Sequence, residues 1–223
     1  MINISPVAFA ARKGLRALGI ILSHGHALEL TAAVLSYRTF AALQAEERNS
    51  VSPSLGDAGH IVLQQDVLTV RLRDLGLASE TQAVVFDVLS RAFEGAEGVW
   101  QSGAQIHRSF EDLKDHLAQD TQTRAWTDDG VISAYAETNA YVDEFYTDSY
   151  EFDGSLFDVA DCWCAVLAGT HTGEQDPDRV YYGHRGDFEA TYSFDKAGRC
   201  GLIETDFSIR LSFEQDYGED GAS

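Results

Sequence analysis

Residues 187–213, DFEATYSFDKAGRCGLIETDFSIRLSF, contain two runs in which apolar and polar side chains alternate. The apolar positions are Phe188, Ala190, Tyr192 and Phe194 in the first run and Phe207, Ile209, Leu211 and Phe213 in the second. A period of two places successive side chains on opposite faces of a β-strand, so each run predicts a strand with one buried face. Turn residues at 195–198 follow the first run and separate the two strands.

Further strands are predicted upstream of this stretch. Tyr141–Phe152 and Cys162–Ala168 have strand-like composition, and the second is apolar enough for a central strand. Residues 67–73 also alternate apolar and polar side chains and are predicted to form a strand. From about Val131 onward, the chain is expected to contain strands in place of helices.

The first half of the chain is predicted to be helical. Three short helices are expected at 7–18, at 24–36 with Ser23 as the N-cap, and at 39–47. Two later helices are indicated by apolar residues at helical spacing. The first follows a capping-box pattern at Ser79 and Gln82 and has Val85, Val88, Leu89 and Ala92 on one face. The second has Ile106, Phe110, Leu113 and Leu117 on one face.

Helices followed by strands, without alternation of the two, predict an α+β fold with a small N-terminal helical bundle and a mostly antiparallel sheet. Residues 49–59 are rich in Ser, Pro and Gly and are typical of a linker. We therefore expect a helical module at 1–48, an acidic α+β domain at 60–216 and a polar tail at 217–223.

Composition excludes several classes of protein. The 223 residues are 44% hydrophobic and include only 3 Pro and 3 Cys, which excludes a disordered chain, a collagen-like polymer and a disulfide scaffold. Arg16 interrupts the apolar run at 15–22, and no stretch approaches the ~20 apolar residues of a membrane span. We expect a cytoplasmic protein that does not associate with membranes.

Charge is distributed unevenly along the chain. The formal net charge is −20, yet residues 1–50 carry five basic and three acidic residues. Residues 125–178 contain 13 Asp or Glu and no Lys or Arg. Such a surface repels nucleic acid and attracts basic protein partners, although a solvated acidic face can also serve solubility alone.

Aromatic and acidic residues are interleaved between Tyr141 and Asp153. Rings supply buried anchors at interfaces, and carboxylates steer and pair with basic groups. The leading hypothesis is therefore a non-enzymatic interaction protein that binds a basic protein surface, as an inhibitor, an immunity protein or a DNA mimic does. The residues predicted to bind the partner are Asp143, Glu144, Asp148, Glu151, Asp153, Asp158 and Asp161.

The N-terminal string ARKGLRALGIILSHGHALELTAAVLSYRTFAALQAE, residues 11–46, resembles the small helical module of bacterial glyoxalase-related proteins and some mobile-element proteins. The shared features are the basic first helix, Leu22-Ser23-His24, residues 27–30, and the 35–40 turn, where the family more often has Gly at Ser36 and Trp at Phe40. The resemblance implies a metal-dependent, glyoxalase-like enzyme as the alternative function. No catalytic residue or metal ligand of that class can be placed on this sequence.

The same helices admit a helix-turn-helix interpretation, which makes a DNA-binding regulator acting through residues 1–50 the third hypothesis. Ala32, Tyr37 and Ala42 suit the small and apolar positions of that motif. In that interpretation the helix at 39–47 would contact the DNA bases. It ends in Glu46-Glu47-Arg48, whose two carboxylates would repel the DNA phosphates.

No catalytic, cofactor or metal site is predicted, because the common phosphate, dinucleotide and hydrolase motifs are absent from the sequence. His171 and His184 lie in Gly-flanked polar segments and are expected in exposed turns; a site formed by them with Glu189 and Glu204 is the alternative. Cys162 and Cys164 should share one face of a strand opposite Trp163, and the three thiols, Cys200 included, are expected to be buried.

Overall fold

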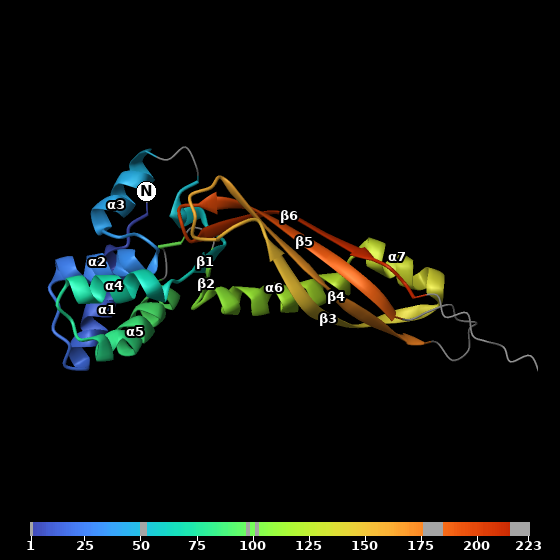
Figure 1. Cartoon of the computed structure of the whole chain (residues 1–223), viewed down its shortest axis with the longest axis horizontal. Coiled ribbons are helices and arrows are strands. Elements are labelled where there is room, and N and C mark those ends of the chain that lie inside the picture. The colour runs from blue at the N-terminus through green and yellow to red at the C-terminus, as the bar shows by residue number, and fades with distance from the viewer. Residues whose placement is uncertain (1, 50–52, 97–98, 101–102, 176–184, 215–223) are drawn as a thin grey trace, which may run out of the picture. The chain divides into compact units, whose positions relative to one another are not determined.

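The computed structural model describes residues 2–49, 53–96, 99–100, 103–175 and 185–214. It confirms the predicted α+β fold (Figure 1). One six-stranded sheet has the strand order β2-β1-β6-β5-β4-β3. The pairs β3–β4 and β1–β6 are antiparallel, whereas the short strands β1 (His60–Val62) and β2 (Gln105–His107) are parallel. The sheet is therefore mixed and mostly antiparallel, as predicted.

The chain divides into two compact units. Unit 1 comprises residues 1–113, 154–163 and 194–204, and unit 2 comprises residues 114–153, 164–193 and 205–223. The predicted domains were 1–48 and 60–216, but residues on both sides of the expected linker at 49–59 belong to unit 1. Helix α6 and strands β4, β5 and β6 each continue from one unit into the other.

Five helices form most of unit 1: α1 (Ser5–Ala17), α2 (His24–Val34), α3 (Phe40–Asn49), α4 (Gln65–Asp74) and α5 (Gln82–Glu94). Helix α1 packs on α2 and α5, and α2 packs on α4, so the three predicted N-terminal helices share a core with the next two (Figure 1). Ser23 is the N-cap of α2 as predicted, since its side chain accepts a hydrogen bond from the backbone N–H of His26. Ser36 has φ 69°, a conformation that glycine adopts at least cost.

Helix α4 occupies the stretch predicted to be a strand, so that prediction was wrong. A strand would bury Leu68, Val70 and Leu72 together, but Val70 is 53% exposed while the two leucines are buried. The two leucines are four positions apart in the sequence, so both lie on one face of a helix. Arg71 and Arg73 fall in the last turn, where positive charge interacts favourably with the helix dipole.

Unit 2 contains all of α7 (Asp129–Thr138) and β3 (Ala140–Phe152). It also contains most of α6 (Phe110–Ala125) and the longer parts of β4 (Cys162–Gln175), β5 (Arg185–Ala197) and β6 (Gly201–Leu211). The predicted alternation of β5 is confirmed, because Phe188, Ala190 and Tyr192 are buried. The Tyr192 hydroxyl contacts the Leu117 carbonyl and Thr121 on α6. We call this helix-covered side of the sheet the inner face.

Helix α7 contradicts the prediction that helices end near Val131. The Asp128 carboxylate accepts a hydrogen bond from the Val131 N–H at 2.9 Å and caps the first turn. Val131, Tyr135 and Thr138 are buried at helical spacing, and Asn139 ends the helix with φ 60°. The cap and the left-handed Asn were visible in the sequence as a helix start and stop.

Candidate functional site

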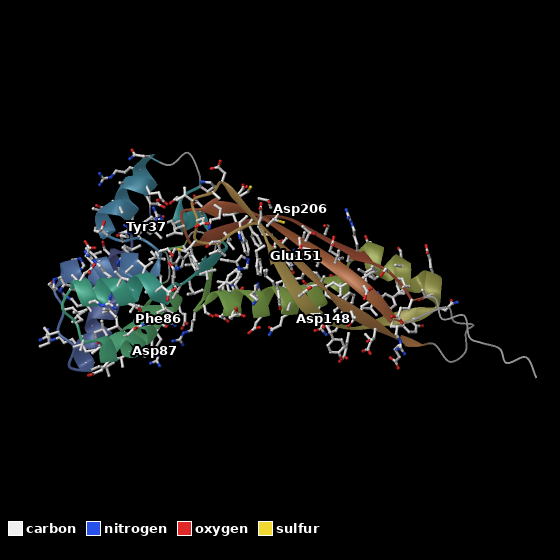
Figure 2. All side chains as sticks on the ribbon, viewed as in Figure 1. Tyr37, Phe86, Asp87, Asp148, Glu151 and Asp206 are labelled. Atoms are coloured by element: carbon white, nitrogen blue, oxygen red, sulfur yellow. The ribbon has the colours of Figure 1, made fainter. Side chains whose placement is uncertain are left out.

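The side of the sheet opposite α6 and α7 in unit 2, which we call the outer face, is exposed and acidic. No helix in the described part of unit 2 covers it, and its strands present polar side chains at alternate positions. Its exposed carboxylates are Glu144, Glu151, Glu174, Asp187, Glu189 and Asp206, two of which Figure 2 labels on β3 and β6. Arg185 and Arg210 are exposed at outer-face positions of β5 and β6.

The seven residues predicted to bind a partner are all exposed, and they are divided between the two units. Asp143, Glu144, Asp148 and Glu151 lie on β3, and Asp153 follows it, so these five belong to unit 2. The other two, Asp158 and Asp161, lie in the connection from β3 to β4 and belong to unit 1. Five of the predicted residues therefore belong to unit 2, and two belong to unit 1.

Two irregularities set the pattern along β3, which is an outermost strand of the sheet. Its pairing with β4 shifts between Val142 and Glu144 and again between Thr147 and Ser149. The residues at these bulges are Asp143 and Asp148. Bulges and exposed charges at an edge strand oppose pairing with another sheet, so the acidic residues of β3 also protect this edge.

Four outer-face acids were missed in the sequence: Glu174, Asp187, Glu189 and Asp206. The signal for two of them was present, because Asp187 and Glu189 alternate with the buried Phe188 and Ala190. A strand that buries those apolar residues must expose the acids on the other face. Glu174 could not be found in this way, because β4 was predicted to end at Ala168 and it continues to Gln175.

In the described part of the chain, the carboxylates of β3 lack a salt bridge to a basic side chain. Within the described residues, none of the five acids from Asp143 to Asp153 forms an ion pair with Lys or Arg, and the Tyr146 hydroxyl donates a hydrogen bond to Glu144. Ion pairs lie elsewhere, for example Arg124 with Asp120 on α6 at 2.6 Å. By sequence, unit 2 holds 20 acidic and 5 basic residues, a net −15 of the total −20.

The six exposed carboxylates of the outer face outnumber its two exposed arginines, and strand geometry sets the distances over which such charges interact. Alternate residues of one strand lie about 7 Å apart and adjacent strands about 4.8 Å apart, both below the Debye length of about 8 Å at physiological ionic strength. Like charges on neighbouring strands repel and destabilise the sheet. The outer face therefore presents a negative potential that a cationic surface would relieve.

A groove with a volume of about 490 Å³ lies between α7 and the start of β3 in unit 2. Three large side chains that line it are exposed: Trp126 by 52%, Ile132 by 46% and Tyr141 by 60%. The Trp126 indole N–H donates a hydrogen bond to the Asp143 carbonyl oxygen at 3.0 Å. Of the described residues that line this groove, Asp143 alone is charged.

A buried polar network lies beside this groove. The Tyr135 hydroxyl is 2.5 Å from Nδ1 of His171, and Nε2 of His171 is 2.9 Å from the Ser212 carbonyl oxygen. A carbonyl can only accept, so Nε2 of His171 carries a proton. The Tyr135 hydroxyl also donates to the Thr172 carbonyl oxygen at 2.9 Å, so its one proton is shared between that oxygen and Nδ1 of His171. Burial lowers the pKa of His171 and raises that of the Tyr135 phenol, to which the Asp143 carboxylate also contributes. Both groups are thus neutral, as a structural hydrogen-bond network requires.

The prediction that His171 lies in an exposed turn was wrong, because it is fully buried on β4 between Phe145 and Phe213. The flanking glycines indicated a turn, but Gly173 has a packing role. A Cβ at this position would lie 2.4 Å from a ring carbon of Tyr135 and 2.7 Å from the Tyr141 carbonyl oxygen. Only glycine lets α7 approach β4 this closely.

The alternative metal site is contradicted for His171 and Glu189. His171 is buried on the inner face, whereas Glu189 is exposed on the outer face, so the two cannot share one ion. His184 lies outside the described residues. Within the residues that the structure describes, no group of three His, Cys, Asp or Glu side chains could hold a metal ion.

The cysteines are only partly as predicted. Trp163 is buried and Cys162 and Cys164 alternate with it, as expected for a strand. Cys200 is buried, but Cys162 is exposed and Cys164 is half-buried, so the expectation of three buried thiols was wrong. All three are free thiols, and burial raises the pKa of Cys200 to about 12.

Polar contacts in unit 1 tie the N-terminal helices to the β5–β6 turn. The Tyr37 hydroxyl, labelled in Figure 2, donates to Glu46 at 2.8 Å, and Arg199 pairs with Glu46 at 3.2 Å. Lys196 is buried and donates to the carbonyl oxygens of Leu156 and Arg199; burial lowers its pKa to about 8. These contacts stabilise the β5–β6 turn, and Glu46 of α3 therefore has a structural role.

Comparisons with protein-family models, curated proteins and solved structures find no match to this chain. In the described part of the chain, no helix has both the length and the apolarity needed to cross a bilayer. Function must therefore be argued from the acidic outer face and the adjacent groove.

Proposed function

We propose that this chain is a non-enzymatic interaction protein that binds the basic surface of a partner protein through the acidic outer face of unit 2. An inhibitor, an immunity protein or a DNA mimic works in this way. The observation that carries the proposal is the set of exposed carboxylates on a sheet face that no helix of the described unit covers.

Energetics favour a partner over solubility alone as the reason for this arrangement. Acids needed only for solubility do not have to gather on one face, and gathering them costs stability through mutual repulsion. Unit 1 also has an exposed surface but carries a net charge of only −5, with 16 acidic and 11 basic residues. The concentration of charge in unit 2 is what a basic partner would exploit for fast and salt-sensitive encounter.

The test is charge reversal with a matched control. The triple variant Glu151→Lys, Glu189→Lys and Asp206→Lys changes exposed acids of the outer face, whereas Asp66→Lys, Glu80→Lys and Glu94→Lys changes exposed acids of unit 1. Each triple shifts the net charge by the same amount. Affinity capture from the native host, at salt of about 50 mM and about 500 mM, is followed by mass spectrometry.

We expect the unaltered chain to capture a basic protein at low salt and to release it at high salt. The outer-face triple should lose this protein, and the unit 1 triple should retain it. Equal capture by both triples, or capture that salt does not weaken, would reject the proposal.

A further inference from the structure

The groove beside α7 combines aromatic walls with negative charge, and this combination selects a particular ligand chemistry. Trp126, Ile132 and Tyr141 expose about half of their side chains around one hollow of about 490 Å³. Exposed apolar groups gathered around a concave site commonly mark a binding surface. The groove lies wholly within unit 2, which has a net charge of −15.

Trp126 is fixed in place before any ligand arrives. Its indole N–H donates to the Asp143 carbonyl oxygen at 3.0 Å, which connects the end of α6 to the first bulge of β3. An exposed ring held by a hydrogen bond loses little conformational freedom on binding. The indole is therefore a preorganised platform, and a cation above an indole face gains a favourable cation–π interaction.

The charge of the groove excludes an anionic ligand. Asp143 supplies a carboxylate, Glu144 follows it on the same strand, and no Lys or Arg lies among the described lining residues. An arginine side chain matches both features, since its stem packs on apolar walls while its guanidinium stacks on a ring and pairs with a carboxylate.

We propose that this groove binds an arginine side chain of the basic partner, stacked on Trp126 and paired with Asp143. The inference rests on the proposed function and specifies where on unit 2 the partner's anchor residue docks. Interfaces concentrate their binding energy in such buried aromatic and arginine contacts. The outer-face carboxylates would then supply steering, and the groove would supply specificity.

The test uses a defined probe, the blocked pentapeptide Gly-Leu-Arg-Leu-Gly, and a second peptide in which citrulline replaces arginine. Citrulline has nearly the same shape but no charge. Isothermal titration calorimetry measures both affinities. Tryptophan fluorescence locates the site, because Trp126 is 52% exposed while Trp100 and Trp163 are only 8% and 2% exposed.

We expect the arginine peptide to bind about tenfold more tightly than the citrulline peptide and to change the Trp126 emission. Trp126→Ala and Asp143→Asn should each weaken arginine binding about tenfold, and Trp126→Phe, which keeps a ring, should weaken it less. Ile21→Ala is the matched control, because Ile21 is 83% exposed in unit 1 and should have no effect. Circular dichroism checks that each variant is folded.

Equal binding of the two peptides would show that the groove binds apolar side chains without regard to charge, and it would overturn the inference. Arginine-peptide binding that Trp126→Ala does not weaken, in a folded variant, would overturn it as well. Failure of the peptide to bind, while the outer-face triple still loses partner capture, would reject the groove alone. Peptide binding together with partner capture that survives the outer-face triple would instead reject the proposed function.

Discussion

At the scale of single residues, His171 shows how burial makes stability depend on pH. The imidazole is fully buried, and desolvation lowers its pKa from the usual value of about 6.5. The unfolded chain binds a proton near that usual value, whereas the folded chain does not. Folding stability is therefore complete above about pH 6.5 and falls as the pH drops toward the folded pKa, by up to about 1.4 kcal/mol per pH unit.

This predicts that His171→Gln reduces the loss of stability between about pH 7.5 and about pH 5.5. Glutamine can still hydrogen-bond to Tyr135 and Ser212 but does not titrate. Urea denaturation at the two pH values measures the difference, and His24→Gln at an exposed position is the control. An identical pH dependence in the unaltered chain and in His171→Gln would contradict the prediction. Proton NMR of His171 provides a second measurement, since the midpoint of its titration in the folded protein should lie below the usual value of about 6.5.

At the scale of elements, α7 depends on its cap. The Asp128 carboxylate accepts from the Val131 N–H at 2.9 Å, and the helix has 10 residues, a length at which isolated helices are marginal. The same helix carries Tyr135 to His171 and lines the groove with Ile132. Loss of the cap should therefore loosen both the buried network and the proposed arginine site.

Asp128→Ala is predicted to lower the free energy of unfolding by about 1 kcal/mol, because a backbone donor loses its partner. Asp128→Asn should cost only a few tenths of that amount, because asparagine caps helices as well as aspartate does. Both variants remove the same charge, so comparing them by urea denaturation separates capping from electrostatics. Equal losses in the two variants would show that charge, not the cap, stabilises α7.

The elements also show what a sequence can predict and where it fails. The strands β5 and β6 were predictable because the inner face is buried in β5 and half-buried in β6, while the outer face is more exposed in both, which imposes a clear period of two. Residues 67–73 were misassigned because a short alternating run also places Leu68 and Leu72 on one helical face. Within β4, the glycine at 173 indicated a turn, but a close approach of Tyr135 requires it.

The candidate site was only partly predictable for a related reason. The acids of β3 are consecutive in sequence and were found, whereas Asp187, Glu189 and Asp206 join them only through strand order. The groove brings Trp126, Ile132 and Tyr141 together through the reversal between α7 and β3. That reversal follows α7, which was not predicted although its cap and helical spacing are present in the sequence. Local pattern thus identified the charge, and tertiary structure was needed to define the surface.

At the scale of the whole molecule, charge is divided between the units. Unit 2 has a net charge of −15 and unit 1 has −5, although unit 2 contains fewer residues. Repulsion among the exposed acids of unit 2 opposes its compact state in the unbound protein. A partner that supplies positive charge would relieve this repulsion, and so would added salt, without any partner present.

Repulsion among the outer-face acids also predicts that the stability of the unbound protein depends on salt. Raising NaCl from about 20 mM to about 300 mM should raise the Tm of the unaltered chain, because the Debye length shortens and the outer-face acids cease to repel. In the variant Glu151→Gln, Glu189→Gln and Asp206→Asn, the Tm at low salt should be higher and the salt-induced rise smaller. The control Asp66→Asn, Glu80→Gln and Glu94→Gln removes the same charge from unit 1, where acids and bases are mixed, and should keep most of the salt-induced rise. Calorimetry at constant pH measures all three proteins. If the two triple variants reduce the salt dependence equally, the repulsion arises from the net charge of the protein and not from the outer face.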